Sequence, residues 1–274
     1  MPLTLMYITN DPAVALIAEK HGVDRIWIDL ETKGKDLRQK NMNTVKSHHS
    51  VSDIRTMASC LTKSELMVRI NAWDENSPDE VEQVLRAGAQ RIMLPMWKSA
   101  EEADAFLKAV NRRAATTLLL ETKEAVECLD QVLENPLVEE IHIGLNDLHL
   151  SYQLKFMFEL LSNGTVEALC KKISAKGIPV GFGGIARIGE GLLPAENILM
   201  EHVRLGSSVV ILSRSFCDID ATMSLEQIES LFCENIRKIR EYEVYSAGCS
   251  VQTWQENQAA VAEKVAAIVA RKGV

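Results

Sequence analysis

Short apolar segments alternate with amphipathic helical patterns eight times along this chain, and that alternation restricts the possible fold more than any other feature. Each strand and helix pair takes about 25 to 30 residues, a spacing typical of βα units in a parallel sheet. The expected strands are residues 3–8, 25–30, 65–70, 91–95, 116–121, 140–144, 177–182 and 207–212. Eight such units favour a closed (β/α)8 TIM barrel over an open doubly wound sheet.

Two more amphipathic helices are expected after the barrel. The first begins with a capping box at residues 224–227, and the second carries an apolar stripe that includes Trp254, Val261 and Val265. We therefore predict a barrel domain at residues 1–215 and C-terminal helices at residues 216–274. The last helix has to bury its stripe, either on its own barrel or by exchange onto a partner subunit.

Composition excludes several classes of partner. A net charge of -8 argues against a sequence-independent grip on nucleic acid or on an anionic membrane surface, because both need a basic face. No apolar run approaches the roughly 20 residues that span a bilayer, and no positive region precedes the apolar residues at 1–9. We expect a cytoplasmic protein whose six cysteines, which form no C-x-x-C pair, are reduced thiols.

Two expected strands end on acidic residues. One strand ends on Glu121, and the strand at 140–144 runs through Gly144 to Asn146 and Asp147. The ends of neighbouring parallel strands lie roughly 4.8 Å apart at one rim, so both carboxylates can reach one cation. Oxygen ligands favour a hard divalent ion such as Mg²⁺ or Mn²⁺. Singly, each acid could instead favour the start of the following helix, as a cap or through the helix dipole.

Further polar residues and glycines are expected at the same rim. They are Asp29 and Glu31 after the second strand, Arg69 on the third, and Gly181, Gly183 and Gly184 around the seventh. Burial of an unpaired guanidinium is costly, so Arg69 is predicted to bind an anionic group of a substrate, although Glu31 or Glu121 could pair with it instead. The glycines would let backbone approach a ligand, or serve as plain turn residues.

The histidines give a weaker signal. His142 is expected to be a strand residue that faces a helix, and His149 is expected inside a helix. Residues 32–50 form a long polar connection, which favours a functional loop over a strand end, and this loop contains His48 and His49.

Five short motifs occur in order at residues 26–31, 68–70, 92–96, 119–122 and 143–148. Together they resemble the HpcH/HpaI aldolase and citrate lyase β-subunit family of the pyruvate and phosphoenolpyruvate barrel superfamily, over roughly residues 20–215. The resemblance implies a (β/α)8 barrel, a divalent metal held by Glu121 and Asp147, and an Arg69 that steadies the oxygen of a pyruvate-type enolate. It also implies carbon-carbon bond cleavage or formation, and often a terminal helix exchanged within a homo-oligomer.

The chain departs from that family at one position that matters for acid-base chemistry. Family aldolases typically follow the acid of the second strand with a Glu-His pair whose histidine serves in acid-base chemistry, and Thr32 stands in its place here. The acyl-CoA lyase branch has an Asp-Leu-Glu-Asp pattern, which this chain matches only over residues 29–31. His48 or His49 could supply the missing imidazole, since histidine titrates near neutral pH. Two solvated loop histidines are the alternative.

The sequence thus predicts a divalent-metal-dependent lyase of the class II aldolase type, which cleaves or forms a hydroxy keto acid through a metal-stabilised enolate. A small keto acid would be bound by Arg69, Gly144, Asn146, Asp147 and Gly183. The first alternative is a citrate lyase-like acyl-CoA lyase, for which Lys33, Lys35, Lys40 and Lys46 could meet nucleotide phosphates. The second is a barrel without turnover that binds a metabolite, and Thr32 is the residue that favours it.

Overall fold

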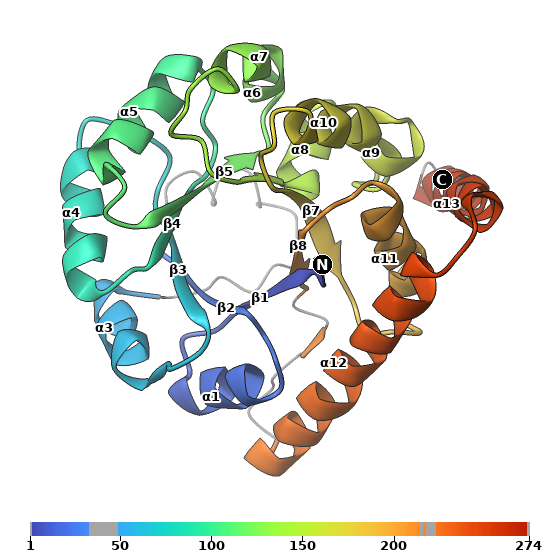
Figure 1. Ribbon diagram of the computed structural model, residues 1–274, viewed down its shortest axis with the longest axis horizontal. Coiled ribbons are helices and arrows are strands. Elements are labelled where there is room, and N and C mark those ends of the chain that lie inside the picture. Colours follow the sequence, from blue (N-terminus) through green and yellow to red (C-terminus); the bar gives the residue numbers. More distant parts are fainter. Residues whose placement is uncertain (1, 33–48, 214–215, 218–222, 273–274) are drawn as a thin grey trace.

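The computed structural model describes residues 2–32, 49–213, 216–217 and 223–272. Within them, eight parallel strands close into a barrel in sequence order, with β8 beside β1 (Figure 1). The strands are β1 (Thr4–Ile8), β2 (Arg25–Asp29), β3 (Glu65–Arg69), β4 (Arg91–Leu94), β5 (Ala115–Leu120), β6 (Ile141–Ile143), β7 (Val180–Ile185) and β8 (Val209–Leu212). The predicted (β/α)8 barrel is confirmed.

Helices surround the barrel in the same order (Figure 1). They are α1 (Pro12–Lys20), α3 (Val51–Cys60), α4 (Ser77–Ala87), α5 (Ala100–Val110), α6 (Lys123–Glu127), α7 (Leu129–Val132), α8 (Leu145–Ser151), α9 (Glu159–Ser162), α10 (Thr165–Ser174) and α11 (Ala195–Arg204). Their apolar faces pack on the outward-facing strand residues, as the fully buried Val81 and Val84 of α4 and Phe106 of α5 illustrate. In the described part of the chain, no helix combines the length and the apolar composition that crossing a bilayer requires.

Strand β7 differs most from its expected position. It begins at Val180 and continues through the glycines to Ile185, whereas a strand at 177–182 was predicted. Its pairing with β8 steps from Gly181 opposite Val209 to Gly184 opposite Ile211, so three steps on β7 match two on β8. This is a β-bulge, and Gly183 within it has a left-handed backbone with φ 55°.

The barrel interior is layered. An apolar layer lies below the mouth and consists of Met6, Trp27, Met67, Met93, Leu119 and Val209. Because side chains alternate along a strand, the residues two positions earlier and two positions later also face inward. The earlier positions form the floor of the barrel, and the later positions form the mouth.

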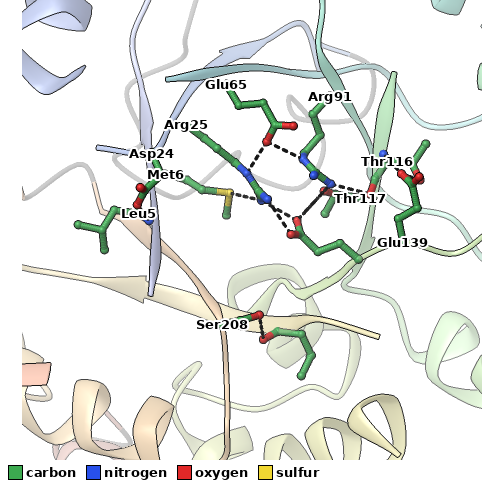
Figure 2. Close-up of polar contacts among 12 residues, drawn as sticks. Leu5, Met6, Asp24, Arg25, Glu65, Arg91, Thr116, Thr117, Glu139 and Ser208 are labelled. Atoms are coloured by element: carbon green, nitrogen blue, oxygen red, sulfur yellow. Dashed lines mark hydrogen bonds and ion pairs between the residues drawn. The ribbon is translucent and has the colours of Figure 1, made fainter. Parts of the chain in front are cut away.

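The floor is a buried ion cluster (Figure 2). Arg25 donates from Nη1 and Nη2 to the two carboxylate oxygens of Glu140, at 2.7 and 2.9 Å. Its Nε lies 2.7 Å from Glu65, which also accepts from Arg91 at 2.9 Å. Thr117 donates to Glu140 at 2.7 Å. Charges from β2, β3 and β4 are thus paired with Glu140, the residue just before β6, at the end of the barrel where polar residues serve stability.

Two long helices follow the barrel, α12 (Leu225–Ala247) and α13 (Val251–Lys272). The predicted capping box at the start of α12 is present, because Ser224 accepts from Gln227 N–H and the Gln227 side chain accepts from Ser224 N–H. Helix α12 packs on α1 and α11, and α13 packs on α11 and α9 (Figure 1). Of the two predicted locations for the stripe of α13, this single chain shows the one on its own barrel, with Val261 and Val265 buried.

Candidate active site

A cavity of about 350 Å³ opens at the carboxyl ends of the strands. Six predicted site residues line it together: Arg69, Glu121, Gly144, Asn146, Asp147 and Gly183. A larger groove of about 610 Å³ lies at the opposite end, beside the start of β1 and the C-terminal end of α12. Its charged residues Arg240 and Glu243 pair with each other at 2.8 Å. Convergent charged groups therefore make the smaller cavity the candidate site.

Glu121 is placed by two neighbours. It follows β5, only 3% of its surface is exposed, and its Oε1 accepts the backbone N–H of Met96 at 3.1 Å. Met96 has φ 54°, a left-handed conformation that is uncommon outside glycine and that occurs at functional sites. A Cβ on Gly144 would lie 2.8 Å from Glu121 Oε2. Glycine at position 144 therefore leaves the space that the carboxylate occupies.

Asp147 completes a pair of carboxylates. It lies in the first turn of α8, directly after β6, and shares with Glu121 both the cavity and an adjoining outer pocket of about 380 Å³. Burial raises the pKa of Glu121 well above 4.5, and the negative charge of Asp147 raises it further. The two acids therefore lie close enough for one charge to disfavour the other.

Asn146 and Asp147 also bring backbone groups to the mouth. The first backbone bond of α8 runs from Leu148 N–H to Gly144 C=O at 3.0 Å. The N–H groups of the residues before Leu148 therefore precede the helical ladder. The Asn146 side chain is exposed at this rim.

Arg69 is fixed at the end of β3 by two acids. Its Nε and Nη2 donate to Asp29 Oδ1 and Oδ2, both at 2.9 Å, and Nη2 lies 3.3 Å from Glu31. The guanidinium lies over the ring of Trp27, 4.8 Å from its centroid. Burial would lower the pKa of Arg69, but the charges of Asp29 and Glu31 raise it, so the side chain is cationic. Asp29 and Glu31, which are expected at the same rim, both contact Arg69.

The prediction that His142 faces a helix is wrong. Its position on β6 has the same parity as Glu140 and Gly144, so it faces the barrel interior, where it is fully buried in the wall of the cavity. Its spacing of two residues from Gly144 could have shown that His142 faces the barrel interior. Burial lowers the pKa of His142 to about 4, so the imidazole is neutral at pH 7. His149 lies in α8, as predicted, with Nδ1 3.2 Å from Leu145 C=O.

The predicted acid-base residues have different outcomes. His48 lies outside the described residues, as do Lys33, Lys35, Lys40 and Lys46. His49 is half-buried, and its Nδ1 accepts the backbone N–H of Asp29 at 2.9 Å, but it is not among the described residues that line the cavity. Thr32, at the departure from the family pattern, donates its backbone N–H to Asn71 Oδ1 at 2.9 Å.

The chemistry of the mouth fits a hard cation. Among the described residues, no group of three or more histidines, cysteines, aspartates and glutamates could hold a metal. The carboxylates in the cavity lining are those of Glu121 and Asp147. Mg²⁺ is commonly held by one or two carboxylates, with water and substrate oxygens at its other positions. A cation would also offset the repulsion that raises the pKa of Glu121.

Fold and site together define the class of the protein: a (β/α)8 barrel with the buried Glu121 and the half-buried Asp147 beside a paired arginine at the carboxyl ends of its strands. The family model for HpcH/HpaI aldolase/citrate lyase matches residues 3–173, more than half of the chain. The protein belongs to that family. Its general activity is therefore that of a lyase of the aldolase and citrate lyase type.

Solved structures agree on the fold. An HpcH/HpaI aldolase from Desulfitobacterium hafniense DCB-2 has a TM-score of 0.61 and 16% identity, over 88% of this chain and 93% of that one. An HpcH/HpaI aldolase/citrate lyase family protein from Burkholderia cenocepacia J2315 has a TM-score of 0.59 and 16% identity, over 88% of this chain and 94% of that one. RipC from Yersinia pestis has a TM-score of 0.55 and 16% identity, over 84% of this chain and 94% of that one. No curated protein matches the sequence.

Proposed function

We propose that this protein is a divalent-metal-dependent aldolase that cleaves or forms a hydroxy keto acid. One observation carries the proposal: Glu121 and Asp147 line the same cavity as the cationic Arg69, and the charge of Asp147 helps to raise the pKa of Glu121. Two acids that repel each other at the mouth of the barrel are stabilised by a cation. The family of the chain supports this choice over a purely structural acid pair.

Glu121 and Asp147 would hold the metal. When bound, a divalent ion acts as a Lewis acid on the oxygens of an α-keto acid. Met96 N–H keeps one Glu121 oxygen in place, and Gly144 leaves the second oxygen room. The protein side of this site is therefore largely pre-formed, which reduces the reorganisation that binding requires.

Arg69 would stabilise negative charge on the substrate. Its contacts with Asp29 use Nε and Nη2, so the described residues leave the Nη1 side for a ligand oxygen in the cavity. A fixed cation next to the position where enolate charge develops stabilises the transition state without moving. Asn146 and Asp147 N–H groups would bind the substrate carboxylate, with Gly144 and Gly183 as neighbouring backbone.

His49 is the described candidate for proton transfer. Its Nδ1 accepts from Asp29 N–H, so in the neutral ring the proton lies on Nε2. In this tautomer the Nε2–H group can donate a hydrogen bond to the carbonyl oxygen of an aldehyde, which polarises that carbonyl for attack by the enolate. His48 remains a second candidate by sequence alone.

The test is a metal-dependent cleavage assay. Metal-free protein is given a 4-hydroxy-2-oxo acid with and without Mg²⁺ or Mn²⁺, and release of pyruvate is followed. We expect turnover only with metal, and its loss in Glu121→Ala, whereas the matched exposed-acid variant Glu127→Ala retains it; the Glu127 side chain is 62% exposed and pairs with Lys123. Equal rates with and without metal would contradict the proposal.

Two other activities are separated in the same assay. Cleavage of a malyl thioester in place of the free hydroxy keto acid would indicate the citrate lyase-like alternative, whose candidate lysines lie outside the described residues. Binding of pyruvate without product formation under saturating metal would indicate a metabolite-binding barrel. Neither alternative has a described contact that favours it.

We also infer a homo-oligomer in which α13 is exchanged between subunits. Only residues 248–250 separate α12 from α13, and the buried stripe of α13 packs on α11. An exchanged α13 can make the same contacts on a partner chain. Light scattering on the purified protein tests this inference, and a monomeric mass would contradict it.

A further inference from the structure

His142 and the β7 bulge form one unit in the wall of the cavity. The Nε2 of His142 lies 3.2 Å from Gly183 C=O. A carbonyl only accepts, so Nε2 carries the proton and donates it to Gly183. Pairing between β6 and β7 runs only as far as Ile143 opposite Phe182, so Gly183 follows the last matched pair. A bulge residue leaves the ladder, and His142 supplies the donor that its carbonyl lacks there.

Two glycines make this contact possible. A Cβ at Gly181 would lie 2.8 Å from His142 Nδ1 and 2.3 Å from Val209 C=O, so only glycine leaves room for the imidazole. Gly183 has φ 55°, a conformation that glycine adopts at little cost. The histidine ring is fully buried against both positions.

The bulge in turn supports the start of α8. A Cβ at Gly183 would lie 2.8 Å from Leu145 Cδ1, so the backbone of Gly183 packs directly on the first residue of that helix. Leu145 is 1% exposed and precedes Asn146 and Asp147. A shift of the Gly183 peptide would therefore displace the turn that carries Asp147.

We propose that His142 is a positioning residue, which holds the Gly183 bulge and thereby fixes the turn of α8 that carries Asn146 and Asp147. The importance of that turn for metal binding rests on the proposed function. The contacts from His142 through Gly183 to Leu145 are independent of the proposed function. His142 is neutral at pH 7, so it acts by hydrogen bonding and shape rather than by charge.

Three variants test the inference. His142→Phe keeps a ring and removes the donor, whereas His142→Gln keeps a donor at a similar distance from the backbone. His202→Phe is the matched control: His202 is also fully buried, stacks on Phe182 and binds Ser207, but it does not line the cavity. Amide hydrogen exchange at residues 145–148 and 183–185 and the Mn²⁺ dissociation constant are measured for each.

We expect His142→Phe to speed exchange in both segments and to weaken Mn²⁺ binding about 10-fold, the scale seen for residues that orient metal ligands. His142→Gln should restore most of both properties. His202→Phe should lower the melting temperature and leave both segments and the Mn²⁺ affinity unchanged. Gly183→Ala, whose Cβ meets Leu145, should reproduce the effects of His142→Phe and serves if that variant does not fold.

Unchanged exchange in both segments of His142→Phe, or of Gly183→Ala where the former does not fold, would overturn the inference. So would faster exchange with unaltered Mn²⁺ affinity. If the unmodified protein binds no Mn²⁺, the proposed function fails, while the exchange measurement still decides whether His142 holds the bulge and the start of α8.

Discussion

Arg69 and Asp29, opposite each other on β3 and β2, form a two-point ion pair with both donor-acceptor distances at 2.9 Å. The Asp29 side chain is fully buried and that of Arg69 is 12% exposed. A planar fork of this kind fixes the direction of a guanidinium as well as its charge. The cation at the cavity is therefore oriented by the sheet itself.

Asp29→Asn should weaken both the fold and the site. Removing the charge leaves a buried guanidinium with Glu31 as its remaining acid, so we expect a loss of about 1.5–3 kcal/mol in the free energy of unfolding and a lower kcat/KM. Urea denaturation and steady-state kinetics measure the two effects. Glu241→Gln breaks an exposed pair with Arg237 and should change neither. An Asp29→Asn protein of normal stability would contradict this account of Arg69.

The pKa of Glu121 predicts how stability varies with pH. Burial and the charge of Asp147 raise this pKa in the folded protein well above 4.5, so the folded state holds its proton more tightly than the unfolded chain. The stability that this provides is present below pH 4.5 and is lost as pH rises through the raised pKa. Thermal unfolding across that range, without metal, should show a decline that Glu121→Gln reduces. The same slope in both proteins would contradict the assignment.

Metal binding should release a proton from the same pair. A cation favours the ionised form of Glu121, so Mn²⁺ affinity should rise with pH until the raised pKa is passed. Titration calorimetry in buffers of different ionisation enthalpy measures the number of protons released. An affinity that does not depend on pH over this range would show that Glu121 is not a ligand.

Gly144→Ala should damage the site and spare the fold. The added Cβ would lie 2.8 Å from Glu121 Oε2 and 2.9 Å from its Cβ, so the carboxylate has to move. Misplacement by about 1 Å at such a site can reduce turnover roughly 100-fold. Gly248→Ala is the control, because its nearest contacts are at 3.5 and 3.7 Å and it lies between α12 and α13. Normal turnover in Gly144→Ala would contradict the packing described for Glu121.

Glu140→Gln should separate stability from function. Burial alone would raise the pKa of Glu140, but hydrogen bonds and charge from Arg25, with the charge of Arg91, hold it below 4.5. Breaking such a buried pair costs about 3–5 kcal/mol. We expect that loss at pH 7, shrinking as pH falls through the low folded pKa, with unchanged Mn²⁺ affinity per folded molecule. Denaturation at several pH values measures this loss of stability. Weaker Mn²⁺ binding by the folded variant would contradict the separation, because it would show that the floor of the barrel affects the mouth.

Sequence periodicity was sufficient to predict the barrel because eight apolar segments of similar spacing have few other ways to bury their side chains. It also placed Glu121, Asp147 and Arg69 at one rim, since strand ends in a parallel barrel converge. The bulge in β7 was not predicted, because its glycines are equally typical of a turn.

Other features were missed for a different reason. His142 was assigned to the wrong face of β6, although its two-residue spacing from Gly144 indicated the interior. The ion cluster of Arg25, Glu65 and Glu140 depends on contacts between residues far apart in the sequence, and no local pattern reveals which charges meet. Met96 acts through its backbone N–H, so its side chain gave no signal.

The most direct test of the central claim is a Mn²⁺ titration of the unmodified protein beside Glu121→Ala, Asp147→Ala and Asp130→Ala, the last an exposed acid of α7. If Glu121 and Asp147 hold one ion, the unmodified protein and Asp130→Ala bind one equivalent with the same affinity, and each of the other two variants binds far more weakly. Unchanged Mn²⁺ affinity in both Glu121→Ala and Asp147→Ala would contradict the metal site and the aldolase mechanism built on it.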